Sequence, residues 1–289
     1  MTIGVAIGLG LLIGLSLGAL GGGGSILTVP ALVYAVGESA RSATTASLVI
    51  VGITAAVATV GHARAGRVRW GAGLGFGLAG LGASFAGTAL NSHVDPAVLL
   101  ACFAGLMLVA AGAMLAKTMV HAHLEAGGGT QTDLAADAEA ATLRRSGPTL
   151  TQLRPSVSAA ATAPRLSTAV AVRVIPAGVV VGFLTGFLGV GGGFIIVPAL
   201  VLTLSYEMPC AVGTSLLIIS LNSGVALLAR SGHQSFHWAV IAPFTVAAIV
   251  GSTAGRRVAD RVSGAQLTRA FAGLLLVVAA YVFARVVLG

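Results

Sequence analysis

Long apolar runs bounded by polar or charged residues dominate the hydrophobic pattern of this chain. A bilayer core of about 30 Å takes about 20 helical residues, and six runs are that long. They lie at Ser42 to Gly61, Gly71 to Asn91, Pro96 to Ala116, Cys210 to Ala229, Trp238 to Gly255 and Gln266 to Leu288. The pattern predicts a transmembrane helix over each run.

Two further apolar segments are interrupted by glycine. The first, Ile3 to Val36, has 34 residues with GGGGS near its centre, and as one unbroken helix it would be about 50 Å long, too long for one ordinary crossing. Two full crossings would need about 40 residues and a turn. We therefore expect a hairpin of two partial helices that enters and leaves on one side. Such irregular backbone is tolerated at membrane depth only where protein or a wet cavity surrounds it.

The second broken segment repeats the first at a spacing of 168 residues. GLLIGLSLGALGGGGSILTVPALV (10–33) aligns without a gap on GVVVGFLTGFLGVGGGFIIVPALV (178–201), and twelve of the 24 positions are identical. The sequence thus predicts an all-α integral membrane protein with two repeats. Each repeat is a glycine-broken (re-entrant or split) helix followed by three transmembrane helices. The repeats occupy residues 1–120 and 173–289, and residues 121–172 form a linker.

Composition supports the membrane assignment, and charge indicates its orientation. With 56% hydrophobic and 8% charged residues and a mean hydropathy of +0.99, too little polar surface remains for a soluble globule. If the repeats are inverted, thirteen of the 16 basic residues fall on one face of the membrane; parallel repeats give a split of 11 to 5. The positive-inside rule favours the inverted repeat, with the linker cytoplasmic and both termini outside a bacterial-type inner membrane. The net charge of +8 then reflects loops rather than nucleic-acid binding.

The linker and the cysteines suggest no further domain chemistry. The linker is rich in Ala, Thr, Gly and Pro without a sustained apolar face, so we expect a disordered tether; a regulatory or partner-binding element is the alternative. Cys102 and Cys210 have no partner at the repeat offset and no CxxC spacing, so neither a disulfide nor a metal site is expected.

The glycine runs are the candidate binding site for an anion. Each run precedes a new helix, whose first N–H groups lack intrahelical partners and carry the positive end of the helix dipole. The candidate residues are Gly23, Gly24 and Ser25 in the first repeat and Gly191, Gly192, Gly193 and Phe194 in the second. Close helix packing is the alternative. We prefer packing for the glycines that recur every fourth residue, namely Gly10, Gly14, Gly18, Gly178, Gly182 and Gly186.

Polar side chains near the start of the following spans could complete this site. Thr45 and Ser47 correspond in position to the neighbourhood of Thr214 and Ser215; the alternative is that these hydroxyls bond their own helices. Asn222 would face the bundle interior, as ligand or as contact between helices. His62, His233 and His237 fall at span ends, where we expect an interfacial position rather than a proton relay. All eight carboxylates lie in loops, the linker or span ends.

The paired motif carries a family resemblance. GFLGVGGGFIIVPAL (186–200) followed by AVGTSL (211–216), with the degenerate copy GALGGGGSILTVPAL (18–32) and ATTASL (43–48), resembles the sulfite exporter TauE/SafE family of membrane permeases. The first copy departs from the stronger pattern, since Ser25 replaces the third glycine and Thr45 stands opposite Gly213. One half-site is therefore expected to bind differently from the other.

The resemblance implies a transporter that exports or exchanges a small sulfur-containing anion such as sulfite, a sulfonate or sulfoacetate, without a cofactor. The lipid bilayer is its environment, and a homo-oligomer is compatible with the sequence. An anion channel of the same architecture is one alternative. A membrane-embedded enzyme or accessory subunit is another; it would need a nucleophile, metal cluster or paired carboxylates in the spans, and none is visible.

Overall fold

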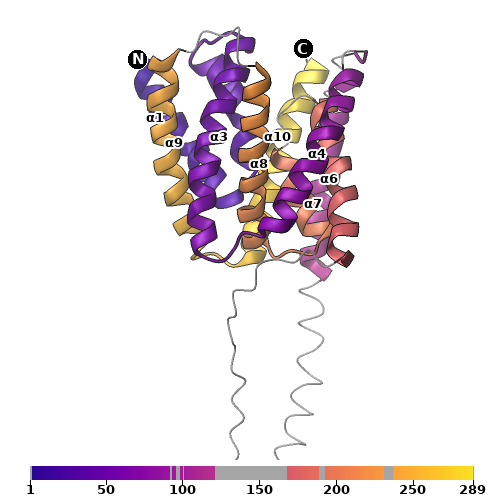
Figure 1. Ribbon diagram of the computed structural model, residues 1–289. Coiled ribbons are helices and arrows are strands. Elements are labelled where there is room, and N and C mark those ends of the chain that lie inside the picture. Colours follow the sequence, from indigo (N-terminus) through magenta and orange to yellow (C-terminus); the bar gives the residue numbers. More distant parts are fainter. Residues whose placement is uncertain are drawn as a thin grey trace, which may run out of the picture.

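The computed structural model describes residues 2–91, 93–95, 98–99, 101–120, 168–188, 193–230 and 237–288, which form helices and short connections without a strand. The first half contains α1 (Thr2–Leu20), α2 (Gly23–Pro30), the π-helical turn η1 (Ala31–Ala35), α3 (Ala40–Arg64), α4 (Trp70–Asn91) and the span Ala101–Val120. The second half contains α6 (Thr168–Leu188), α7 (Gly193–Thr203), α8 (Met208–Arg230), α9 (Trp238–Ala259) and α10 (Gly264–Leu288). The helices stand side by side in one bundle, with both chain termini at the same end (Figure 1).

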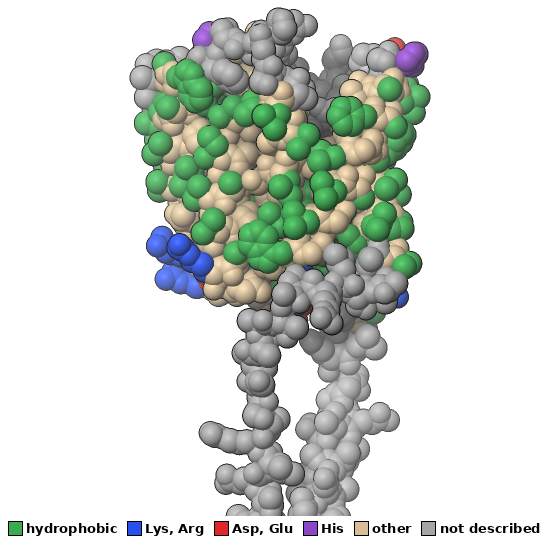
Figure 2. Space-filling model, viewed as in Figure 1, with side chains coloured by type: hydrophobic (Ala, Val, Ile, Leu, Met, Phe, Trp, Pro, Cys, Tyr) green, Lys and Arg blue, Asp and Glu red, His purple; other side chains and the backbone are tan. Residues whose placement is uncertain are grey.

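The helices that the hydrophobic pattern predicts are present. In the described part of the chain, six helices are long and apolar enough to cross a membrane: Ser42–Arg64, Trp70–Asn91, Ala101–Val120, Met208–Leu228, Trp238–Ala259 and Gly264–Phe283. Apolar side chains are spread over the face of the bundle that Figure 2 shows. Large exposed ones include Leu78, Val109 and Leu228, with exposed fractions of 68%, 69% and 74%. Such a surface is unfavourable in water but suits lipid. The prediction of an all-α integral membrane protein is confirmed.

The first glycine run reverses the chain. Gly21 has a φ of +76°, a left-handed conformation that glycine adopts without steric cost. The outgoing arm, α1, has 19 residues and is about 28 Å long, so it is longer than the partial helix we expected. The returning arm is α2 followed by η1. The change from α-helix to π turn occurs at Pro30, which has no N–H to donate to the helix. In the second repeat Pro198 lies within α7, which continues to Thr203.

The first hairpin opens at the end of the bundle where α9 begins. Gly10 lies against Phe244 and Gly18 against Ser252, so α1 and α9 run in the same direction. Glu38, which follows the returning arm, accepts a hydrogen bond of 2.8 Å from Nδ1 of His237, the residue before α9. Both ends of this hairpin therefore lie at one end of the bundle.

The second hairpin opens at the end where α4 begins. Gly178 lies against Phe76 and Gly186 against Ser84, so α6 and α4 run in the same direction. The returning arm leads to α8, where Thr214 accepts a hydrogen bond of 3.1 Å from the N–H of Arg69, directly before α4. This end also holds the ion pair between Arg67 and Asp260, the residue that follows α9. The two hairpins thus open at opposite ends of the bundle.

The longest contacts between helices join the two repeats. α1 packs along α9, and α4 packs along α6. A methyl group added at Gly14 would overlap the backbone of Ala248, and one added at Gly182 would overlap the backbone of Gly80, so both contacts require glycine. The same close approach occurs at Gly10, Gly18, Gly178 and Gly186. The packing interpretation of these six glycines is confirmed.

Most of the expected linker, residues 121–172, lies outside the described residues. Its last five residues belong to α6, which begins at Thr168. The sequence TAVAV there is compatible with a helix, and only the proline and glycine content farther upstream argues against one.

Candidate functional site

The two helix breaks meet inside the bundle. A methyl group added at Gly22 would overlap the carbonyl oxygen of Gly193, and one added at Gly193 would lie 2.5 Å from Ser25 Oγ. The neighbouring Gly21 approaches α8: a methyl group added there would lie 2.5 Å from Ser215 Oγ and 3.2 Å from the Cα of Val212. The structure therefore brings together residues from both halves that are far apart in the sequence.

Both short helices begin at this contact. α2 starts at Gly23, its N-cap residue Gly22 offers no side-chain hydrogen bond, and its first turn has no acidic residue. α7 starts at Gly193 and likewise has no acidic residue in its first turn. The first N–H groups of a helix have no partner within it and carry partial positive charge. Two such helix ends without a carboxylate form an environment that favours an anion. Gly191 and Gly192 lie outside the described residues.

The remaining predicted residues of the breaks have packing contacts. Gly23 faces the side chain of Leu274 on α10, at 2.6 Å from an added methyl group. Gly24 faces the carbonyl oxygen of Ile13 on α1 at 2.6 Å, so it resembles the packing glycines. The ring of Phe194 is fully buried and makes an edge-to-face contact with Phe103 at 5.1 Å. At Gly23, Gly24 and Phe194, only the backbone N–H groups are therefore candidates for binding a ligand.

The predicted hydroxyl groups are hydrogen-bonded, and all of them except the half-buried Ser25 are buried. Ser25 donates to the carbonyl oxygen of Gly22, Ser47 to that of Thr44 and Ser215 to that of Val212, at 2.7 to 2.8 Å. Thr214 and Thr45 are 0% and 2% exposed. A serine that donates to its own helix still offers lone pairs but has committed its proton, so binding of an anion oxygen would require it to rotate. Ser25 and Ser215 are the two hydroxyls that adjoin the breaks.

The sequence analysis missed Thr54, a buried polar residue that matches the predicted residue Asn222. Asn222 Oδ1 is buried without a hydrogen-bond partner, and so is Oγ1 of Thr54, which is 1% exposed. The two positions differ by 168 residues, so each occupies the same place in its repeat. That offset was the signal that could have identified Thr54. Buried oxygens without partners are unusual, so both are candidate positions for binding a ligand or a water molecule.

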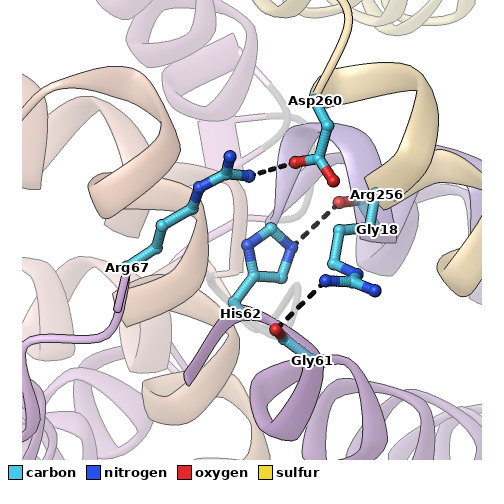
Figure 3. Close-up of polar contacts among 6 residues, drawn as sticks. All are labelled: Gly18, Gly61, His62, Arg67, Arg256 and Asp260. Atoms are coloured by element: carbon cyan, nitrogen blue, oxygen red, sulfur yellow. Dashed lines mark hydrogen bonds and ion pairs between the residues drawn. The ribbon is translucent and has the colours of Figure 1, made fainter. Parts of the chain in front are cut away.

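His62 lies in the last turn of α3, at the end of a span as expected, but its side chain is buried in the protein. It is 1% exposed, and its Nε2 lies 3.3 Å from the carbonyl oxygen of Gly18, three residues before the first break. Its Nδ1 is buried without a partner. Figure 3 shows the imidazole among Arg67, Arg256 and Asp260. The sequence places His62 at the end of a span, but the last turn of α1 covers it.

His237 occupies an exposed position, as expected for a residue at a span end. It pairs with Glu38, and the hydrogen bond from His237 lowers the pKa of the Glu38 carboxyl below its ordinary value. This pair connects the return of the first hairpin to the start of α9. His233 lies outside the described residues.

Comparison with known proteins identifies the family. The family model described as sulfite exporter TauE/SafE matches residues 6–282, which include both repeats and both breaks. The chain belongs to the sulfite exporter TauE/SafE family. Two relatives from Xylella fastidiosa, strains Temecula1 and 9a5c, are each named probable membrane transporter protein. Each is 31% identical over 284 residues, which cover 97% of this chain and 95% of the relative. No solved structure matches the chain.

TauE/SafE membership, the names of both relatives and the six spans agree on one class of protein. The chain is a multi-pass integral membrane protein of the transporter class. The family resemblance seen in the paired glycine motif is confirmed.

Proposed function

We propose that this TauE/SafE-family protein exports or exchanges a small sulfur-containing anion, such as sulfite, a sulfonate or sulfoacetate, and binds it where the two glycine breaks meet. One observation carries the proposal: the N-termini of α2 and α7 come together, through Gly22 and Gly193, with no acidic residue in either first turn.

The chemistry of this contact suits an oxyanion. A sulfite or sulfonate group has three oxygens that share one or two negative charges, and several N–H donors can bind them together. Hydrogen bonds to a charged acceptor are worth about 1.5–3 kcal/mol each. Glycine lets an anion approach the backbone closely. The sulfur chemistry itself comes from the name of the TauE/SafE family.

The proposed orientation provides a driving force for export. We propose an inverted repeat in the inner membrane, with the linker cytoplasmic and both termini outside; the opposite openings of the two hairpins support this arrangement. Moving one charge across 100 mV is worth about 2.3 kcal/mol, so an inside-negative potential favours export of a monovalent anion by about fifty-fold.

Reconstitution into liposomes tests the proposal. Vesicles preloaded with sulfite should show saturable counterflow of radiolabelled sulfite, with sulfoacetate, taurine, thiosulfate and methanesulfonate competing to different degrees. Conductance that does not saturate would identify a channel. If none of these anions moved or competed, the proposed substrate class would be wrong.

A matched pair of variants tests the position of the site. Ser215→Ala removes a hydroxyl beside the break, and Ser252→Ala removes one that is equally buried and also donates to its own helix, to Ile249. We expect only Ser215→Ala to weaken anion binding, by about two- to tenfold, which is the usual net value of one hydrogen bond. Equal effects from both variants would remove the site from the breaks.

A further inference from the structure

The imidazole of His62 connects α3 to the first hairpin. His62 lies in the last turn of α3, whereas its partner Gly18 lies in the last turn of α1. A carbonyl oxygen can only accept, so Nε2 must carry the proton of this hydrogen bond. On the α8 side, Gly213 packs against His62, at 3.1 Å from the Cβ of the histidine to a methyl group added at the glycine. His62 is thus in contact with α1, which leads into the break at Gly21, and with α8, whose Ser215 adjoins that break.

The second ring nitrogen lacks a partner. Nδ1 of His62 is buried and makes no hydrogen bond. With Nε2 protonated, a neutral imidazole presents a lone pair at Nδ1, and only an imidazolium would present an N–H there. An unpaired buried N–H⁺ is far more costly than an unpaired lone pair. The structure therefore fits neutral His62, and a protonated His62 requires an acceptor to approach Nδ1.

Three charged groups surround the ring. Arg67 comes from the connection between α3 and α4, Arg256 from α9, and Asp260 from the residue after α9 (Figure 3). From α1 the carbonyl oxygen of Gly18 faces the ring, and α8 presents Gly213. Arg256 donates to the carbonyl oxygen of Gly61 at 3.2 Å, and Arg67 is paired with Asp260. Asp260 is the one carboxylate among these groups, so it is the acceptor available to a protonated His62.

We propose that His62 binds a proton whose uptake and release are coupled to movement of the anion. The inference rests on the proposed transport function and adds a coupling ion to it. The carboxylates of the sequence lie outside the predicted spans. The buried side chain that binds the coupled proton is therefore the imidazole of His62 rather than a carboxylate.

The coupled step is a proton transfer combined with an exchange of ion-pair partners. A proton from water binds the lone pair of Nδ1, and the imidazolium then competes with Arg67 for Asp260. Arg67 belongs to the connection that also holds Arg69, whose N–H bonds Thr214, and its own carbonyl oxygen packs against Gly213. Release of Arg67 loosens the α3–α4 connection from α8. The bundle then opens between the end that holds Arg67 and Asp260 and the two glycine breaks. The proton returns to water on the opposite side of the membrane when Arg67 and Asp260 pair again.

Proton flux measured together with anion flux tests this inference. The full-length protein is reconstituted in vesicles that contain a pH-sensitive dye, and radiolabelled methanesulfonate is added, because its charge stays constant over the range in which histidine titrates, around pH 6.5. We expect the anion gradient to drive proton movement in the wild type. His62→Gln keeps a donor toward Gly18 but cannot bind a proton. It should let the anion move while proton movement falls to the level of protein-free vesicles.

Control variants separate the possible outcomes. His237→Gln, at an exposed histidine directly before α9 and at the opposite end of that helix from Arg256, should keep the wild-type ratio of protons to anions. If His62→Gln does not fold, Asp260→Asn provides the test: it leaves His62 in place, removes the negative charge that would stabilise an imidazolium, and should lower the same ratio. If neither methanesulfonate nor any anion of the counterflow assay moved in the wild type, the proposed function and this inference would be overturned together. Anion movement without proton movement in the wild type, or an unchanged ratio in the variants, would overturn the inference alone.

Discussion

Gly14 and Gly8 lie in the same helix and should respond oppositely to the same substitution. At Gly14 an added methyl group would lie 2.7 Å from both the Cα and the carbonyl carbon of Ala248, and closer still to its oxygen. Carbon atoms in contact are normally about 3.5–4.0 Å apart, so α1 would have to move about 1 Å away from α9. At Gly8 an added methyl group meets nothing within 4 Å.

The expected magnitudes follow from these contacts. Overpacking costs about 1–3 kcal/mol, and more where the obstructing atoms belong to the backbone. Alanine recovers up to about 1 kcal/mol through helix propensity. We therefore expect Gly14→Ala to lose about 2 kcal/mol, or about 4–8 °C in unfolding temperature. Gly8→Ala should be neutral or stabilising by up to about 1 kcal/mol.

Thermal unfolding of both variants in detergent, with size-exclusion chromatography as a check on folding, measures this difference. Gly105→Ala, on the span Ala101–Val120, provides a second control, since its surroundings are also open. Equal unfolding temperatures for Gly14→Ala and Gly8→Ala would refute the view that α1 and α9 approach through glycine.

Thr214→Val should lower the unfolding temperature as well as anion affinity, because it leaves a backbone N–H of the α3–α4 connection without its acceptor, at a cost of about 1–3 kcal/mol; a change in affinity alone would contradict this. His237→Ala should lower the unfolding temperature near neutral pH, because it removes the partner of the Glu38 carboxylate. Thermal unfolding at several pH values should show this loss of stability disappearing as pH falls from about 4.5, the ordinary pKa of Glu38, through its lowered pKa in the folded protein, where the carboxyl group becomes protonated. A deficit that persisted in acid would mean that the pair with Glu38 is not its source. A cysteine introduced into the linker should be labelled in inside-out vesicles and protected in intact cells; labelling in intact cells only would reverse the proposed orientation.

The sequence predicted those features that repeat at a fixed spacing. The spans follow from the length of each apolar run, and the packing role of Gly10, Gly14 and Gly18 follows from their four-residue spacing. It did not predict the partner helix, because small residues indicate close approach without identifying what approaches. The exchange of partners, α1 with α9 and α4 with α6, depends on the arrangement of the whole bundle.

Polar residues were harder to place from sequence. His62 ends an apolar run, a position typical of an interfacial residue. Its burial depends on the last turn of α1, where its partner Gly18 lies 44 residues earlier in the sequence. Gly24 stands in the same glycine run as Gly22, yet the first faces α1 and the second faces the other break. Neighbours in a turn point in different directions, and composition alone does not distinguish them.

The exchange of partners between repeats has a consequence for how the protein is made. Gly10 is synthesised 234 residues before Phe244, the residue that it contacts (244 minus 10). At about 5–20 residues per second, α1 waits about 10–50 s in the membrane before α9 emerges from the ribosome. During that time its glycine face is covered by lipid, by an insertion factor or by temporary neighbours. A ribosome that stalls before α9 therefore leaves the glycine face of α1 without its native partner helix, even where the other contacts of the hairpin have formed.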